Sequence, residues 1–233
     1  MRCSAASRSI AVMEPDFWHQ RWQENQIGFH QETINAHLRT FWPGLGLPPG
    51  APVFVPLCGK SLDMLWLRSQ GHPVIGVELS EIAANDFFSE NRLPPTVTHE
   101  PPFKKFTADG VTIYCGDFFA LTAARLAAAG AMYDRASLIA LPPSMRQRYA
   151  DAVMEKLPPA ARVALVTVEY DQSKMTGPPF AVAEDEVTRL YSPHFNIDKL
   201  CEVDMTGAEL EPFKKRGLSA MREKVYRLEG KNA

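Results

Sequence analysis

The chain has 233 residues, of which 45% are hydrophobic and 22% are charged, as in ordinary globular proteins. This length suits one domain with a large buried core, whereas two domains would be cramped. The 25 basic and 27 acidic side chains nearly cancel to a net charge of −2, and no basic stripe runs through the sequence, so we expect no nucleic-acid partner. No apolar run approaches the roughly 20 residues that span a bilayer, so we expect no membrane partner either.

Residues 1–12 differ in composition from the rest of the chain. They contain two arginines, several small residues and no acid, and they lack the apolar stretch of a secretory signal. We expect them to be a disordered leader, or the product of an upstream start codon, with residues 13–233 forming a single domain.

The cysteines and histidines predict neither a disulfide framework nor a metal site. The four cysteines are scattered without a Cys-x-x-Cys pair, and Cys58 and Cys115 adjoin predicted strands, which favours buried, unreactive thiols and a cytoplasmic location. The six histidines show no metal-ligand spacing.

Apolar residues that recur at spacings of three and four predict helical structure over residues 14–41, and a Gly-Pro-rich connector follows. Beyond it, short apolar runs alternate with helical patterns. Strands are predicted from Val53, from Val74, over 111–115, over 132–141 and over 161–170, and helices over 60–69, after Ser80 as N-cap, over 119–129 and over 145–157. Consecutive β-α units of this kind form a parallel sheet.

The remaining segments depart from this alternation. Residues 91–106 are Pro-rich and aperiodic, which predicts an excursion over the surface. The polar, Gly-Pro-containing loop 171–180 is long enough to be a candidate lid. A short helix over 184–191 precedes strand-like stretches near 196–205 and 218–228, and because no long helix is expected between these two, we predict that they pair antiparallel.

The ends of the first two predicted strands indicate a ligand. In parallel sheets ligands bind beyond the carboxyl ends of the strands, and Glu78 ends the second strand, where an acid accepts hydrogen bonds from a ribose. The first turn has Gly59-Lys60-Ser61 but Phe54 where a phosphate-binding loop needs glycine, and it lacks the three glycines of a dinucleotide site. A nucleoside without phosphate, S-adenosylmethionine, fits best. A doubly wound domain with an incidental glutamate fits these two segments equally well.

Several blocks along the chain resemble the thiopurine S-methyltransferase family, in the same order and with similar spacing. They are Met13–Trp22, Gly28–Gln31, Val55–Met64, Gly76–Ser80, Tyr133–Ala136, Ser173–Phe180 and Arg222–Tyr226. The resemblance implies an α/β class I methyltransferase (Rossmann-like) fold: a seven-stranded, mostly parallel sheet with helices on both faces, a final antiparallel hairpin and an N-terminal helical cover.

The same resemblance implies the site residues. S-adenosylmethionine is expected to contact Trp22, Leu57, Glu78 and Arg135, its adenine is expected near Asp117 and Phe118, and Phe29 is expected at the substrate pocket. Trp18 and Trp22 lie four residues apart and so share a helix face, from which Trp22 could cover the sulfonium by cation–π attraction; a core tryptophan is the alternative.

Arg135 is the expected catalytic residue. Arginine is seldom buried without a partner, so a structural salt bridge with Asp134 or Glu169 is one interpretation. In the other, Arg135 lies at the cofactor and favours the thiolate form of the substrate.

The chain departs from the vertebrate members of the family near its C-terminus. Those members place a substrate-side arginine where Pro212 aligns, whereas here Lys214, Lys215 and Arg216 follow slightly later. Solvated surface charge is the simplest interpretation of this triplet, and which basic residue completes the pocket is left open.

The implied reaction is an in-line methyl transfer to the sulfur of a small aromatic or heterocyclic thiol by a monomer, in the service of detoxification that extends to selenium or tellurium species. Alignment of the reactants is the main requirement, and because such thiols are acidic no dedicated general base is required. Transfer to halide or bisulfide is the enzymatic alternative. Methylation of nucleic-acid amino groups is disfavoured, because Leu141-Pro142-Pro143-Ser144 keeps only the prolines of the motif for that reaction. A non-catalytic module that binds S-adenosylmethionine is the alternative of another class.

Overall fold

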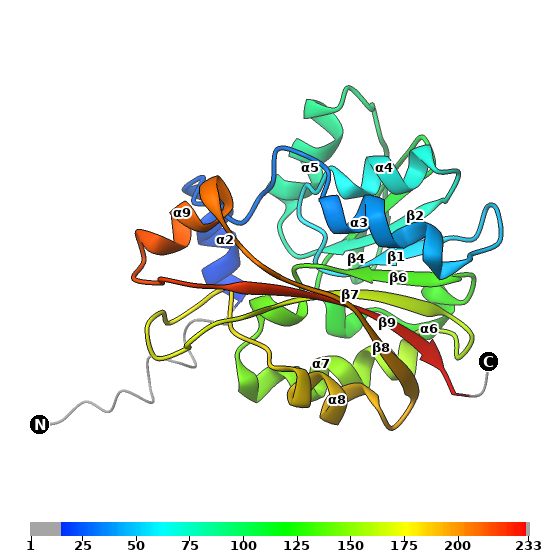
Figure 1. Cartoon of the computed structure of the whole chain (residues 1–233). Coiled ribbons are helices and arrows are strands. Elements are labelled where there is room, and N and C mark those ends of the chain that lie inside the picture. The colour runs from blue at the N-terminus through cyan, green and yellow to red at the C-terminus, as the bar shows by residue number, and fades with distance from the viewer. Residues whose placement is uncertain (1–14, 232–233) are drawn as a thin grey trace, which may run out of the picture.

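The structure, a computed structural model, describes residues 15–231. The predicted leader, residues 1–12, lies outside the described residues. The described chain forms one nine-stranded sheet in the order β3-β4-β5-β2-β1-β6-β7-β9-β8, with helices on both faces (Figure 1).

Five parallel strands form the centre of the sheet. They are β1 (Val53–Val55), β2 (Val74–Glu78), β5 (Val111–Cys115), β6 (Ala131–Asp134) and β7 (Arg162–Glu169). Their apolar runs are covered by helices on both faces, which is why they lack a polar alternation. The predicted strand over 132–141 is too long, because the Asp134 side chain accepts hydrogen bonds from the N–H groups of Ser137 and Leu138 and turns the chain into a 3-10 turn, η3 (Leu138–Ala140).

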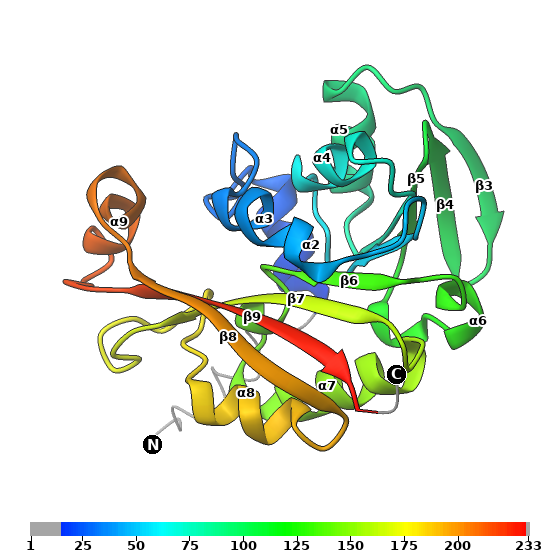
Figure 2. The same ribbon diagram turned by 45° about the vertical axis from the view of Figure 1, so that its right-hand side comes forward.

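The C-terminal strands confirm the predicted antiparallel pair. β8 (Phe195–Asp204) pairs with β9 (Arg222–Gly230), and β9 in turn lies antiparallel to β7. A short helix, α9 (Gly207–Lys214), lies between β8 and β9 and stands away from the sheet (Figure 2).

The other edge of the sheet corrects the sequence analysis. Residues 91–106 are not only a surface excursion: β3 (Thr96–Glu100) and β4 (Phe103–Ala108) form a hairpin beside β5, so the sheet has nine strands where seven were expected. The pattern was invisible because β3 is an edge strand without a fully buried residue, while β4 buries Phe103 and Phe106, three residues apart. Neither strand therefore shows the period of two that identifies a half-buried strand.

The helices divide between the two faces. The α4 (Asp63–Ser69) and α5 (Glu81–Glu90) helices cover one face, and α7 (Pro143–Lys156) and α8 (Glu184–Tyr191) cover the other (Figures 1 and 2). Ser80 is the predicted N-cap of α5, since its hydroxyl accepts from the N–H of Ala83. The predicted helix over 119–129 is wrong: only a 3-10 turn, η2 (Phe118–Ala120), and one helical turn, α6 (Ala123–Leu126), form there, because the chain is extended at Leu121 and Thr122.

The N-terminal helical region is interrupted. It forms α2 (Pro15–Gln23), α3 (Ala36–Phe41) and a 3-10 turn, η1 (Trp42–Leu45), with a loop between α2 and α3. Asn35 starts α3 as its N-cap by accepting from the N–H groups of His37 and Leu38. Both α2 and α9 lie at the end of the sheet where β7 finishes (Figure 1). None of the helices in residues 15–231 is long and apolar enough to cross a membrane.

Candidate active site

A cavity of about 1370 Å³ opens at the carboxyl ends of the parallel strands. Its walls come from α2, the loop before α3, the turns after β1, β2, β5 and β6, and the segments around Pro178 and α9. The residues proposed from the sequence all line it: Trp22, Phe29, Leu57, Glu78, Asp117, Phe118 and Arg135. The fold thus brings together residues that are up to 113 positions apart in the chain.

Glu78 ends β2 with its carboxylate fixed by two backbone groups. One oxygen, Oε2, accepts from the Gly59 N–H at 2.8 Å, and the other, Oε1, accepts from the Ser80 N–H at 2.7 Å. Burial raises the pKa of this carboxyl, and the backbone hydrogen bonds partly oppose that rise. Each oxygen retains further acceptor capacity toward the cavity, so the geometry suits a pair of donor hydroxyls, as on a ribose.

The turn after β1 is shaped for close approach. Leu57 has a positive φ of 42°, which is uncommon for a residue with a branched side chain, and Gly59 has a φ of 52°. A Cβ atom at Gly59 would lie 3.3 Å from the ring of Trp22, so the indole rests against this backbone. A glycine is needed here for both the conformation and the contact.

An aromatic cluster of Trp18, Trp22 and Phe29 forms the α2 side of the cavity. The ring of Phe29 lies 5.7 Å from both indoles in edge-on geometry. Trp22 is buried, whereas Phe29 is 40% exposed, so an uncovered aromatic ring faces the opening. Such an exposed ring on a cavity wall is a contact surface for a flat ligand.

Asp117 and Phe118 differ in their surroundings. Asp117 accepts from the N–H of Phe119 and starts η2, while Phe118 is buried and packs on Tyr149, with ring centroids 5.0 Å apart. The sequence did not indicate Phe119 or Arg148, although the Arg148 guanidinium lies 3.8 Å from the centroid of the Phe119 ring and both residues line the cavity. They come from η2 and α7, and nothing in their local sequence marks this pairing.

Arg135 follows β6 directly, and its partner is neither of those considered from the sequence. Its Nε lies 3.3 Å from Oδ2 of Asp63. Asp134 accepts instead from the Tyr149 hydroxyl at 2.7 Å, and Glu169 pairs with Lys224. Asp63 was missed because it is 72 residues from Arg135 in a different β-α unit.

Two further polar groups line the cavity: Arg216, one of the three basic residues left open by the sequence, and His37, which the sequence did not indicate. Arg216 lines the cavity and donates from Nη1 to the Pro178 carbonyl at 3.0 Å, and burial lowers its pKa. His37 Nε2 lies 3.0 Å from Oε2 of Glu223, which joins α3 to the start of β9. Of the basic triplet, Lys214 pairs with Glu211 on the surface, so the solvated interpretation holds for Lys214, whereas Arg216 lines the cavity.

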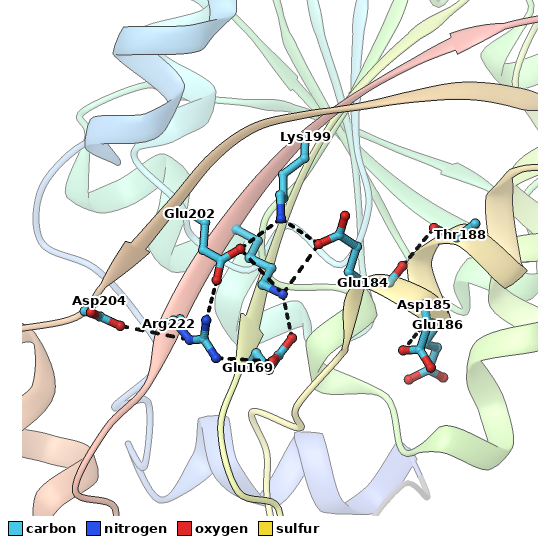
Figure 3. A network of polar contacts seen from close by, with 10 residues as sticks. Glu169, Glu184, Asp185, Glu186, Thr188, Lys199, Glu202, Asp204 and Arg222 are labelled. Atoms are coloured by element: carbon cyan, nitrogen blue, oxygen red, sulfur yellow. Dashed lines mark hydrogen bonds and ion pairs between the residues drawn. The ribbon is translucent and has the colours of Figure 1, made fainter.

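The candidate lid, loop 171–180, is flanked by two glutamates that form ion pairs with one lysine (Figure 3). Glu169, the last residue of β7, lies 2.7 Å from the buried ammonium of Lys224, and Glu184, the first residue of α8, lies 3.8 Å from it. Between these ends, the Tyr170 hydroxyl donates to the Pro179 carbonyl at 2.6 Å. Both ends of the loop are therefore held in place, and its C-terminal end lines the cavity through Pro178 and Pro179.

The thiols near the site have raised pKa values. Burial raises the pKa of Cys58 well above its ordinary value, and burial together with the charge of Glu78 raises the pKa of Cys115 to about 11. Cys58, Cys115 and Cys201 are free, and in residues 15–231 no cluster of side chains could hold a metal ion. Nothing at this site resembles an activated cysteine nucleophile.

The family model of thiopurine S-methyltransferase matches residues 13–231. The chain belongs to the thiopurine S-methyltransferase family. It is 50% identical over 218 residues to the thiopurine S-methyltransferase of Pseudomonas fluorescens (strain Pf0-1), covering 94% of this chain and 100% of the relative. It is 49% identical to that of Azotobacter vinelandii (strain DJ), covering 93% and 99%.

Solved structures show the same fold at low identity. An S-adenosylmethionine-dependent methyltransferase from Anabaena variabilis superposes with a TM-score of 0.65 at 16% identity, covering 93% of this chain and 95% of that one. The 1,6-didemethyltoxoflavin-N1-methyltransferase of Burkholderia thailandensis, with bound S-adenosylhomocysteine, superposes with a TM-score of 0.63 at 18% identity, covering 99% and 92%. The class I methyltransferase fold predicted from the sequence is confirmed, and membership of the family makes the protein an S-adenosylmethionine-dependent methyltransferase.

Proposed function

We propose that the protein transfers the methyl group of S-adenosylmethionine to the sulfur of thiopurines and related aromatic or heterocyclic thiols. Relatives of this name are about half identical to the chain over nearly its whole length. The single structural observation that carries the proposal is the cavity itself, in which a buried ribose-type acceptor, Glu78, and an exposed aromatic wall at Phe29 face one space.

The cofactor half of the cavity is built around the turns after β1 and β2. Glu78 would hold the ribose hydroxyls, the backbone at Leu57 would accept the methionine part, and Trp22 would cover the sulfonium. Asp117 and Phe118, together with Phe119 and Arg148, would surround the adenine. The residues present therefore fit S-adenosylmethionine, which when bound supplies a methyl group on a positively charged, good leaving sulfur.

The protein's own part in the reaction is alignment and desolvation. Phe29 and Trp18 provide faces for a flat acceptor, and Pro178, Pro179 and Arg216 line the same cavity. Holding acceptor sulfur and methyl in line while excluding water supplies several kcal/mol of the barrier reduction. Arg135 would stabilise the thiolate form, because a fixed guanidinium near the sulfur favours the anion.

The lining of the cavity favours an aromatic acceptor over halide or bisulfide. A small anion does not need an exposed phenylalanine on the cavity wall. We further propose that the protein acts as a cytoplasmic monomer on small molecules and not on nucleic acid, and that it serves detoxification, including that of selenium or tellurium species.

The test is methyl transfer from labelled S-adenosylmethionine to a panel of acceptors. Thiopurines and aromatic thiols are expected to be methylated with the highest kcat/KM, above iodide and bisulfide. Higher kcat/KM for the inorganic acceptors would contradict the assigned acceptor class. Binding of cofactor without transfer to any acceptor would favour a non-catalytic module.

A further inference from the structure

A buried carboxylate with no place in the reaction described above lies behind the cavity. Asp63, the first residue of α4, has only 1% of its surface exposed. A buried carboxylate is costly unless it is paired and hydrogen-bonded. Its partners therefore indicate what it does.

Three elements converge on Asp63. Its Oδ1 accepts from the Asn35 N–H at 2.8 Å, and its Oδ2 accepts from the Tyr133 hydroxyl at 3.1 Å. The same Oδ2 lies 3.3 Å from Nε of Arg135. Burial, followed by the charge of Asp63, raises the pKa of Tyr133 well above its ordinary value, so the hydroxyl stays protonated and remains a donor. Asn35 and Tyr133 thus hold the carboxylate independently of Arg135.

The ion pair occupies one edge of the guanidinium. It uses Nε, and among residues 15–231 no other carboxylate lies within 4.0 Å of Arg135. Because the guanidinium is planar and rigid, a carboxylate held beside Nε limits the positions that the two terminal nitrogens can take. Those nitrogens remain available, and Arg135 lines the cavity.

We propose that Asp63 is a positioning residue, which holds Nε of Arg135 and so directs the two terminal nitrogens toward the acceptor sulfur. This inference rests on the proposed role of Arg135 in the reaction. Asp63 also contacts the N-cap of α3, so one carboxylate joins the N-terminal cover to the arginine. Asp63 then contributes to the geometry of the active site as well as to the start of α4.

The experiment is a double-mutant cycle with Asp63→Asn, Arg135→Met and the combination, assayed with one aromatic thiol at saturating cofactor. Asp63→Asn is expected to lower kcat/KM for the acceptor by roughly 10- to 100-fold, the range for a displaced active-site group. In the Arg135→Met background the same change is expected to alter kcat/KM by less than about threefold, because coupled residues are not additive. Affinity for S-adenosylhomocysteine, measured by calorimetry, is expected to change less than the turnover does.

The matched control is Tyr133→Phe, which removes a different partner of the same Oδ2 atom and leaves the ion pair. It is expected to lower the melting temperature while kcat stays within about threefold, because the Asn35 N–H and the charge of Arg135 still hold the carboxylate in place. If Asp63→Asn does not fold, Asp63→Glu replaces it, since the longer side chain keeps the charge but displaces it from Nε.

The outcomes distinguish the positioning role of Asp63 from the catalytic role of Arg135. Equal losses from Asp63→Asn with and without Arg135, or wild-type turnover in Asp63→Asn, would overturn the positioning role while leaving the proposed function intact. Wild-type turnover in Arg135→Met would instead remove the catalytic role of the arginine, and the positioning role with it.

Discussion

Oε2 of Glu78 accepts the Gly59 N–H at 2.8 Å, so the end of β2 and the turn after β1 are joined by the carboxylate that is proposed to bind the ribose. The second oxygen is held by Ser80. Glu78→Gln is therefore expected to weaken binding of S-adenosylhomocysteine by about 1.5 to 3 kcal/mol, the range for hydrogen bonds to charged groups. An amide also presents an N–H₂ group to one of the two backbone donors, so a loss of stability is expected as well. Calorimetry and thermal unfolding measure the two effects separately, and unchanged affinity would exclude the ribose role.

The same carboxylate predicts a pH dependence of cofactor binding. Burial raises the folded-state pKa of Glu78, so the group takes up a proton at a higher pH than an exposed glutamate. Protonation removes the charge that strengthens the ribose hydrogen bonds. Affinity for S-adenosylhomocysteine is thus expected to be constant near neutrality and to fall as pH decreases through that raised pKa. The Glu78→Gln protein, which has no such proton, is expected to show a flatter profile between pH 5 and 8, and parallel profiles would contradict the assignment.

Arg135→Lys keeps the charge but loses the planar fork, and activity is expected to fall even at saturating cofactor. If the arginine stabilises thiolate, the defect should shrink as pH rises above the pKa of the acceptor thiol, where ionisation needs no assistance. Single-turnover methyl transfer from pH 6 to 9 is the measurement. A defect of constant size across this range would indicate a structural arginine.

Arg216→Met is expected to raise KM for the acceptor several-fold while leaving the affinity for S-adenosylhomocysteine unchanged, because Arg216 lines the cavity beside Pro178, whereas the residues proposed to bind the ribose and the methionine part follow β1 and β2. Lys215→Met is the matched control, since it removes a neighbouring positive charge that does not line the cavity. Equal effects of the two substitutions would mean that the general positive charge of the segment, and not Arg216, attracts the acceptor.

The α2 helix and the loop 171–180 are expected to gain protection from hydrogen exchange when S-adenosylhomocysteine and a thiol are both bound. Both flank the cavity at the carboxyl ends of the strands, where lids act. The central strand β6 provides the internal reference, because its protection should follow global stability alone. Identical exchange of the two segments with and without ligands would argue against closure.

The predictable part of this molecule is the part in which local sequence and global fold agree. The strands β1, β2, β5 and β7 follow from continuous apolar runs, and α8 was predicted with its observed limits, Glu184–Tyr191. The β3–β4 hairpin was not predicted, because an edge strand buries too few side chains to produce a periodic apolar pattern. The predicted site residues share one cavity, yet Asp63, Arg148 and His37 were not predicted as site residues, and Arg216 was left open among three basic residues. Each of these is placed by a contact with a residue at least 29 positions away in the chain, which local spacing does not encode.

The indole of Trp22 rests on Gly59, and this contact has a kinetic consequence. If Trp22 covers the bound cofactor, exchange of the cofactor is expected to require displacement of α2 from the turn after β1, and the Phe29 ring, which packs on the indoles of Trp18 and Trp22, is expected to move with it. Steady-state turnover is expected to follow an ordered sequence in which the cofactor enters first and its demethylated product leaves last, at a rate set by α2.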